Sequence, residues 1–213
     1  MKKFILRLFV AILGVITALI FIFLGYLYFP TSHTFNRAKL EKNNYSISFF
    51  DNKNQQINFA TNYLGSKVNI KELPDYLKKA FIAVEDKRFY LHHGVDYRAV
   101  LRAVKNNLST GGIKEGGSTI TQQLIKNTHL TSERTIKRKI KEIKLAIALE
   151  KEYSKDEILG FYLNGVYFGE GAYGIQCAAQ KYFGVDASKL SLAQSCALAA
   201  TVKAPSVYNP STM

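Results

Sequence analysis

The chain has 213 residues and a formal net charge of +13 at pH 7. This length supports one domain with a hydrophobic core and is too short for two complete enzymes. A positive excess of this size suits a partner that carries phosphate, such as anionic lipid, a phosphorylated substrate or nucleic acid. One catalytic or binding unit is therefore expected.

The N-terminal segment carries no charged residue over positions 8–29. A run of this length crosses the roughly 30 Å hydrocarbon core of a bilayer, and it exceeds the h-region of a cleaved signal peptide, the alternative interpretation, which is about 7–15 residues long. Lys2, Lys3 and Arg7 precede it and favour the cytoplasmic side. We expect a cytoplasmic tail at 1–7, a single transmembrane helix at 8–29 and an extracytoplasmic remainder, where nucleic acid is not an expected partner.

Residues 45–64 alternate apolar and polar side chains around Asp51–Asn54. This pattern predicts two short strands and a turn, a small hairpin within a juxtamembrane segment at 30–66. From Pro74 onward the apolar period is helical, which predicts a mainly α domain at 67–213.

The first expected helix of this domain begins at Pro74, ends near Glu85 and presents one apolar face: Leu77, Phe81 and Val84. A second helix at 97–108 has an apolar side that either faces the core or lies among lipid headgroups. A glycine-rich loop at 111–117, which looks mobile, and a helix-compatible stretch at 118–130 follow.

A long basic helix is expected at 133–153, packed by a stripe of isoleucines at positions 136, 140, 143 and 147. Segments 156–163 and 192–202 complete the helical pattern. Cys177 and Cys196 sit among small residues, which favours two buried small side chains over the alternative, a disulfide.

Glu85 and Asp86 close the first helix of the domain. Two adjacent carboxylates repel each other, and a helix C-terminus disfavours negative charge, so at least one of the two should hold a proton more tightly than usual. Such a carboxylate suits general-base work. A solvated surface pair is the plainer interpretation.

A second candidate lies on the basic helix, where the helical period places Arg138, Lys139 and Glu142 on one face, apart from the isoleucine stripe. This face is either a surface ion-pair ladder or part of a site that holds phosphate beside a carboxylate. Between the two candidates, residues 117–127 combine glycines, hydroxyls, amides and Lys126, a composition that favours anions but lacks the P-loop pattern.

Five segments, in order along the chain, resemble the motifs of the peptidoglycan glycosyltransferases of family 51: 85–94, 117–127, 138–142, 158–164 with 167–169, and 203–210. The resemblance implies a mainly α, lysozyme-like domain with a membrane-facing lobe. It also implies polymerisation of lipid II, in bacterial cell-wall synthesis, into β-1,4-linked glycan with release of polyprenyl pyrophosphate. Lipid II, the growing glycan strand and membrane lipid would be its partners, together with transpeptidases and division or elongation proteins.

By this resemblance Glu85 would be the catalytic base, Asp86 would support it, and Glu142 would organise the pyrophosphate, directly or through a divalent cation such as Mg or Mn. Glu142 is the one candidate metal ligand, and no cofactor is required otherwise. The residues implied in substrate binding are Phe89, His92, Ser118, Thr119, Gln122, Gln123, Lys126, Asn127, Arg138 and Lys139.

Gly160 departs from the family pattern, which has an acid there, and it should weaken its helix by roughly 0.5–1 kcal/mol relative to Ala. No Ser-x-x-Lys or Lys-Thr-Gly occurs, so a penicillin-binding transpeptidase half is missing. We expect either a monofunctional enzyme or the front part of a longer one. The rival functions are a glycan-cleaving enzyme, because carboxylates can also protonate a glycosidic oxygen, and a silent membrane-anchored scaffold.

Overall fold

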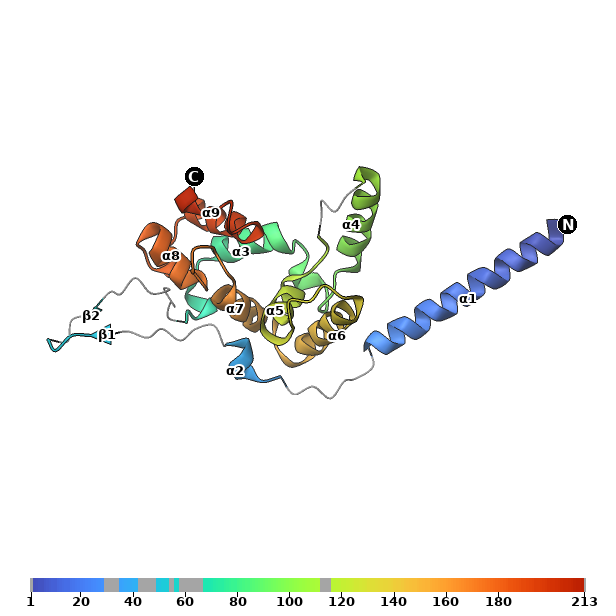
Figure 1. Ribbon diagram of the computed structural model, residues 1–213, viewed down its shortest axis with the longest axis horizontal. Coiled ribbons are helices and arrows are strands. Elements are labelled where there is room, and N and C mark those ends of the chain that lie inside the picture. The colour runs from blue at the N-terminus through green and yellow to red at the C-terminus, as the bar shows by residue number, and fades with distance from the viewer. Residues whose placement is uncertain are drawn as a thin grey trace.

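The computed structural model describes residues 2–28, 35–41, 49–53, 56–57, 67–111 and 116–212. Within these residues the chain is mainly helical, as expected, with one short two-stranded sheet (Figure 1). The elements are α1 (Lys2–Tyr28), α2 (Arg37–Leu40), β1 (Phe49–Phe50), β2 (Gln56–Ile57), η1 (Ile70–Glu72), α3 (Asp75–Glu85), η2 (Phe89–Leu91), α4 (Tyr97–Thr110), α5 (Ile120–His129), α6 (Ile136–Glu152), α7 (Lys155–Gly165), α8 (Ile175–Phe183), η3 (Ala187–Lys189), α9 (Leu192–Lys203) and η4 (Pro210–Thr212).

Helix α1 contains most of the predicted transmembrane segment and extends away from the body (Figure 1). Among the residues that the structure describes, no helix combines the length and the apolar character needed to span a membrane. The C-terminal end of α1 reaches α6, where the Lys144 Nζ lies 3.8 Å from the ring centroid of Tyr26. Leu27 beside it is buried.

The predicted hairpin is present in the described residues. Strand β1 pairs antiparallel with β2, with Phe49 opposite Ile57. The backbone N–H of Lys53 donates to Asp51 Oδ1 at 2.8 Å, a bond that favours a turn at this point. Much of the predicted juxtamembrane segment at 30–66 lies outside the described residues.

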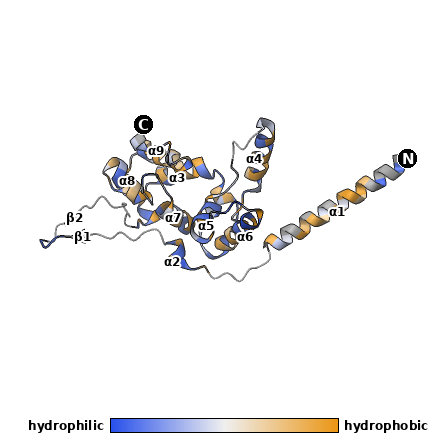
Figure 2. Ribbon diagram, viewed as in Figure 1, coloured by the Kyte–Doolittle hydropathy of each residue, from blue (hydrophilic) through white to orange (hydrophobic). Residues whose placement is uncertain are grey.

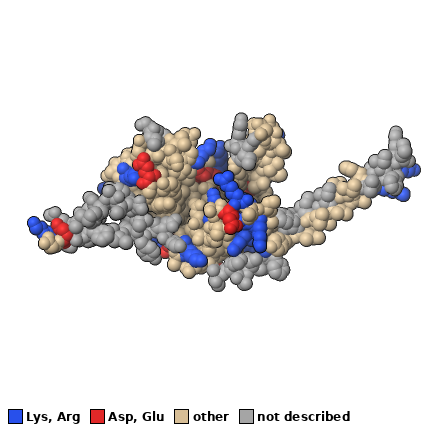
Figure 3. All heavy atoms as spheres, in the orientation of Figure 1, with Lys and Arg blue, Asp and Glu red and all other residues tan. Residues whose placement is uncertain are grey.

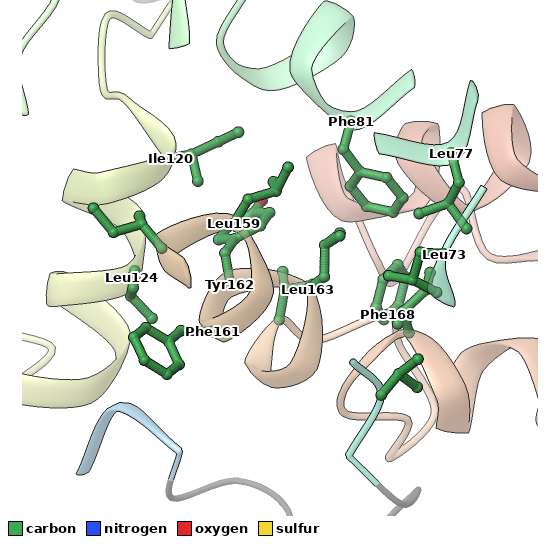
Figure 4. Close-up of a cluster of buried hydrophobic side chains, with 14 of the residues drawn as sticks. Leu73, Leu77, Phe81, Ile120, Leu124, Leu159, Phe161, Tyr162, Leu163 and Phe168 are labelled. Atoms are coloured by element: carbon green, nitrogen blue, oxygen red, sulfur yellow. The ribbon is translucent and has the colours of Figure 1, made fainter. Parts of the chain in front are cut away.

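Helix α7 lies at the centre of the core, and nearly every side of it is covered (Figure 4). Its buried side chains pack against α5 on one side and against Phe81 and Phe168 on the other. Asn164 of α7 binds the chain that precedes η1, because its side chain accepts from the Val68 N–H and donates to the Val68 carbonyl, each at 2.9 Å. These two hydrogen bonds attach the chain at Val68 to α7.

Gly160 leaves α7 unbroken, since the helix runs through it to Gly165. A Cβ added at Gly160 would meet the side chain of Ile70 at 3.6 Å, which is ordinary contact. The space at this position therefore accommodates a Cβ.

The predicted isoleucine stripe of α6 is wrong for most of its members. Ile136 is 81% exposed, and the isoleucines at 140 and 143 are only partly buried, whereas Ile147 is buried. The residues that face the core are Glu142, Leu145, Ala146 and Leu149. Spacings of three and four residues place these on one helix face, so the face that carries Glu142 is also the packing face.

Two other expected apolar faces are corrected in part. In α3, Leu77 and Phe81 are fully buried, but Val84 is 46% exposed. In α4 the core-facing interpretation is wrong, because four of its apolar side chains are 38–79% exposed: Val100, Leu101, Val104 and Leu108. Figure 2 shows the hydrophobic positions along this helix. The glycine-rich loop that follows is described only at its ends, and residues 112–115 lie outside the described residues.

Cys177 is buried and Cys196 is exposed, and both are free thiols. The expected buried small residue is therefore confirmed for Cys177 and wrong for Cys196, and the alternative of a disulfide is excluded in this structure. Helix α8, which carries Cys177, was not expected from the sequence. It begins after Gly174, whose φ of +80° and approach to the Asn164 carbonyl leave no room for a Cβ.

Candidate active site

Glu85 is the last residue of α3, because Asp86 leaves the helical conformation with φ −156° and ψ 75°. The Glu85 side chain is half-buried, and its Oε2 accepts a hydrogen bond from Gln123 Nε2 at 2.7 Å. The Tyr162 hydroxyl donates to Gln123 Oε1 at 3.3 Å. A neutral amide therefore orients Glu85, and no cation is bonded to it among the described contacts.

Asp86 is buried and points the other way, toward the start of α5. Its Oδ2 accepts from the Ile120 backbone N–H at 3.0 Å and is 2.9 Å from His92 Nε2. The Ile120 N–H is one of the free donors at a helix N-terminus, where the helix dipole also favours a negative charge. Asp86 therefore joins the end of α3 to the start of α5.

Thr119 begins α5 with a capping box: it accepts from the Gln122 N–H, and the Gln122 side chain accepts from the Thr119 N–H. The Thr119 hydroxyl donates to the Gly94 carbonyl at 2.7 Å. Gly94 has φ +90° and lies against the backbone of Ala146 in α6, where a Cβ would come within 2.7 Å. This close approach brings the loop after α3 onto the helix that carries Glu142.

Glu142 is 2% exposed and is held by two cations of its own helix. Arg138 Nη1 lies 2.7 Å from Glu142 Oε2, and Lys139 Nζ donates to Oε1. Lys139 also donates to the Ser118 hydroxyl at 2.8 Å, which links α6 to the residue before the α5 cap. Ser118, Arg138, Lys139 and Glu142 thus form one bonded cluster.

The remaining predicted ligand residues divide by exposure. Phe89 is fully buried, and Thr119 and Gln122 are buried in the capping box, so in this structure they support the site from inside. Lys126 and Asn127 are exposed near the end of α5. Their roles in substrate binding stay predictions.

Positive charge gathers over the part of the body where α5 and α6 lie (Figure 3). Within the described residues, no group of three or more acidic, histidine or cysteine side chains could hold a metal ion. Both oxygens of Glu142 already accept from cations. A divalent ion there would stand beside two positive charges, so the residues present do not fit a resident metal at Glu142.

Sequence reasoning did not select three polar residues behind this site: Thr121, Glu150 and Lys155. Glu150 and Lys155 form a salt bridge with Nζ to Oε2 at 2.7 Å, although they lie five residues apart across the junction of α6 and α7. That spacing is not a helical pairing, so no periodic pattern reveals it. Thr121 donates to Glu150 Oε1.

The described residues therefore bring together a half-buried carboxylate, Glu85, a buried carboxylate, Asp86, and a cluster of cations around Glu142. A family model described as Transglycosylase matches residues 53–213. The chain belongs to this transglycosylase family.

Named relatives agree with the family match. The chain is 54% identical over 143 residues to penicillin-binding protein 1F of Bacillus subtilis (strain 168), a match that covers 67% of this chain and 20% of that protein. It is 50% identical over 143 residues to penicillin-binding protein 1A of Aquifex aeolicus, covering 67% and 20%. It is 48% identical over 155 residues to the monofunctional glycosyltransferase of Staphylococcus saprophyticus, covering 70% and 57%. The match thus spans 20% of the two penicillin-binding proteins.

Proposed function

We propose that this chain is a peptidoglycan glycosyltransferase that polymerises lipid II into β-1,4-linked glycan and releases polyprenyl pyrophosphate. The observation that carries the proposal is the contrast between the two carboxylates. Glu85 is half-buried and bonded to a neutral amide, whereas Glu142 lies among cations. The surroundings of Glu85 suit a general base, and those of Glu142 suit the binding of an anion.

In the proposed reaction Glu85 removes the proton from the sugar hydroxyl of the acceptor. The hydroxyl oxygen then bonds to the anomeric carbon of the lipid-linked chain end, while the bond from that carbon to the pyrophosphate breaks. Attack opposite the leaving group converts an α-linked donor into a β linkage. The electron pair leaves with the pyrophosphate, whose charge Arg138, Lys139 and Lys126 offset.

Asp86 has a supporting role in this proposal. Because it is bonded to the Ile120 N–H and lies 2.9 Å from His92 Nε2, it fixes the turn that follows Glu85. Gln123 fixes the Glu85 carboxylate itself. The base is thus held in one orientation before substrate arrives.

We propose that the enzyme works at the outer face of the cytoplasmic membrane, with 8–29 as a single-pass anchor. The uncharged run and the described α1 side chains support this, since many of them, such as Phe21 and Ile22, are more than half exposed. The outward apolar side of α4 fits the headgroup layer, where Leu101 and Leu108 are 70% and 79% exposed. Resistance of the protein to extraction from membranes at high pH tests the anchor. Recovery in the soluble fraction would refute it.

The decisive experiment incubates detergent-solubilised protein with labelled lipid II and resolves the products by size, beside Glu85→Gln. Long glycan from the wild type and none from the variant is the expected result. Shortening of added polymeric glycan, with lipid II unchanged, would indicate the glycan-cleaving enzyme instead. Binding of lipid II without turnover, in conditions where a known polymerase works, would indicate the silent scaffold.

A further inference from the structure

A buried ion pair lies behind the supporting carboxylate, outside the segments that carry the family resemblance. Glu150, near the end of α6, and Lys155, the first residue of α7, lie 2.7 Å apart. Their side chains are only 3% and 19% exposed. Desolvation lowers the pKa of Lys155. A buried pair of this kind is often no more stable than apolar residues of the same size, so stability alone does not explain it.

The pair contacts His92, which is one of the two groups bonded to Asp86, and Thr121, the neighbour of the other. On one side, Lys155 Nζ lies 3.5 Å from Nδ1 of His92, whose Nε2 is 2.9 Å from Asp86 Oδ2. On the other side, Glu150 Oε1 accepts from the hydroxyl of Thr121. Thr121 follows Ile120, whose N–H is the second donor to Asp86.

These contacts determine which ring nitrogen of His92 carries the proton. An ammonium group only donates hydrogen bonds, so an Nδ1 that faces it must act as the acceptor. The single ring proton of neutral His92 then sits on Nε2 and is donated to Asp86. Glu150 Oε1 lies 3.9 Å from the same Nδ1 and would draw a proton there if the ammonium were absent. Among the described residues, the charged groups in contact with the ring are Asp86, Glu150 and Lys155.

We propose that Lys155, held by Glu150, is a positioning residue for the base: it holds the ring proton of His92 on Nε2 and so keeps the hydrogen bond from His92 to Asp86, beside Glu85. This inference rests on the proposed polymerase function for its kinetic consequence. In the absence of the ammonium, a ring proton drawn to Nδ1 by Glu150 would remove the donor that His92 Nε2 provides to Asp86. The hydrogen bond that holds Asp86 beside the base would then be lost.

The test combines ¹⁵N spectra of the histidine rings with lipid II kinetics for Lys155→Met and Lys155→Arg. In the wild type at neutral pH, His92 should show protonated Nε2 and unprotonated Nδ1. In Lys155→Met, Nδ1 should gain the proton, and kcat should fall about tenfold while KM changes less than about twofold, the order expected for one lost charge-assisted hydrogen bond. Lys155→Arg should restore most of kcat, because the charge returns.

Lys78→Met is the matched control, since Lys78 also pairs with an acid, Asp75 at 2.7 Å, but lies at the start of α3. It should change neither the His92 spectrum nor kcat. An unchanged His92 spectrum in Lys155→Met, or protonated Nδ1 in the wild type, would overturn the inference. Protonated Nδ1 in the wild type would overturn it even if Lys155→Met fails to fold. A wild type that leaves lipid II unpolymerised would instead overturn the proposed function.

Discussion

The two acidic ends of the site are built in opposite ways. Glu85 ends a helix, remains half-buried and is oriented by the amide of Gln123 at 2.7 Å. Glu142 lies in the middle of a helix, is 2% exposed and is neutralised by Arg138 and Lys139. Glu142 is thus bonded to two cations, whereas the described hydrogen bond of Glu85 comes from a neutral amide. The contrast supports the roles proposed above, proton transfer for Glu85 and charge organisation for Glu142.

The largest expected effect comes from Glu85→Gln, which keeps the shape of the side chain and removes the base. The rate of polymerisation should fall by about 100- to 10,000-fold, the usual contribution of a general base. The unfolding temperature should stay close to that of the wild type, because the amide oxygen of the substituted side chain can still accept from Gln123. Separation by size of the glycan formed from lipid II measures the polymerisation rate, and thermal unfolding in detergent measures the unfolding temperature. A near-wild-type rate would show that Glu85 is not the base.

A second prediction concerns Gly94, where the loop after α3 packs against α6, the helix that carries Glu142. Gly94→Ala should lower the free energy of unfolding by about 2–4 kcal/mol, because the new Cβ would lie 2.7 Å from the Ala146 carbonyl at a φ of +90°. Gly111→Ala is the control, since Gly111 also has positive φ but no atom within 4 Å of an added Cβ. Denaturant unfolding should show a clearly smaller loss for Gly111→Ala. Equal losses would mean that backbone strain alone, and not contact with α6, matters at Gly94.

A third prediction concerns the cationic end. Lys139→Ala should lower kcat/KM for lipid II about tenfold, because it removes one of the charges proposed to offset the pyrophosphate. Its unfolding free energy should change by less than about 1 kcal/mol, since the side chain is 39% exposed and Arg138 still pairs with Glu142. Lys137→Ala, at an exposed position of the same helix, should change neither. Comparable losses of kcat/KM and stability in Lys139→Ala would make this cluster structural.

The sequence was sufficient for the helical class, for the ends of α3 and for the clustering of Arg138, Lys139 and Glu142, because these depend on local periodicity and capping. It was misleading about α6, where four isoleucines outweighed Leu145, Ala146 and Leu149 in the apolar pattern. Which of two apolar faces is buried depends on the partner helix, and only tertiary packing decides that. The same limit explains Glu150 and Lys155, since contacts across a helix junction follow from the turn between the helices.

The smallest expected effect is on the pH dependence of the unfolding free energy, through the buried phenol of Tyr162. Tyr162 is 1% exposed beneath Gln123, and burial raises the pKa of its phenol well above the usual value of 10. Below pH 10 both the folded and the unfolded chain keep this proton. The folded state therefore has its full stability with respect to Tyr162 in this range. Above pH 10 the unfolded chain releases the proton and the folded chain retains it, so stability falls as pH rises. Between pH 10 and pH 11 the wild type should lose about 1 kcal/mol more unfolding free energy than Tyr162→Phe. The difference between the two proteins cancels the other tyrosines and lysines, and parallel pH curves would show that the Tyr162 phenol ionises as easily folded as unfolded.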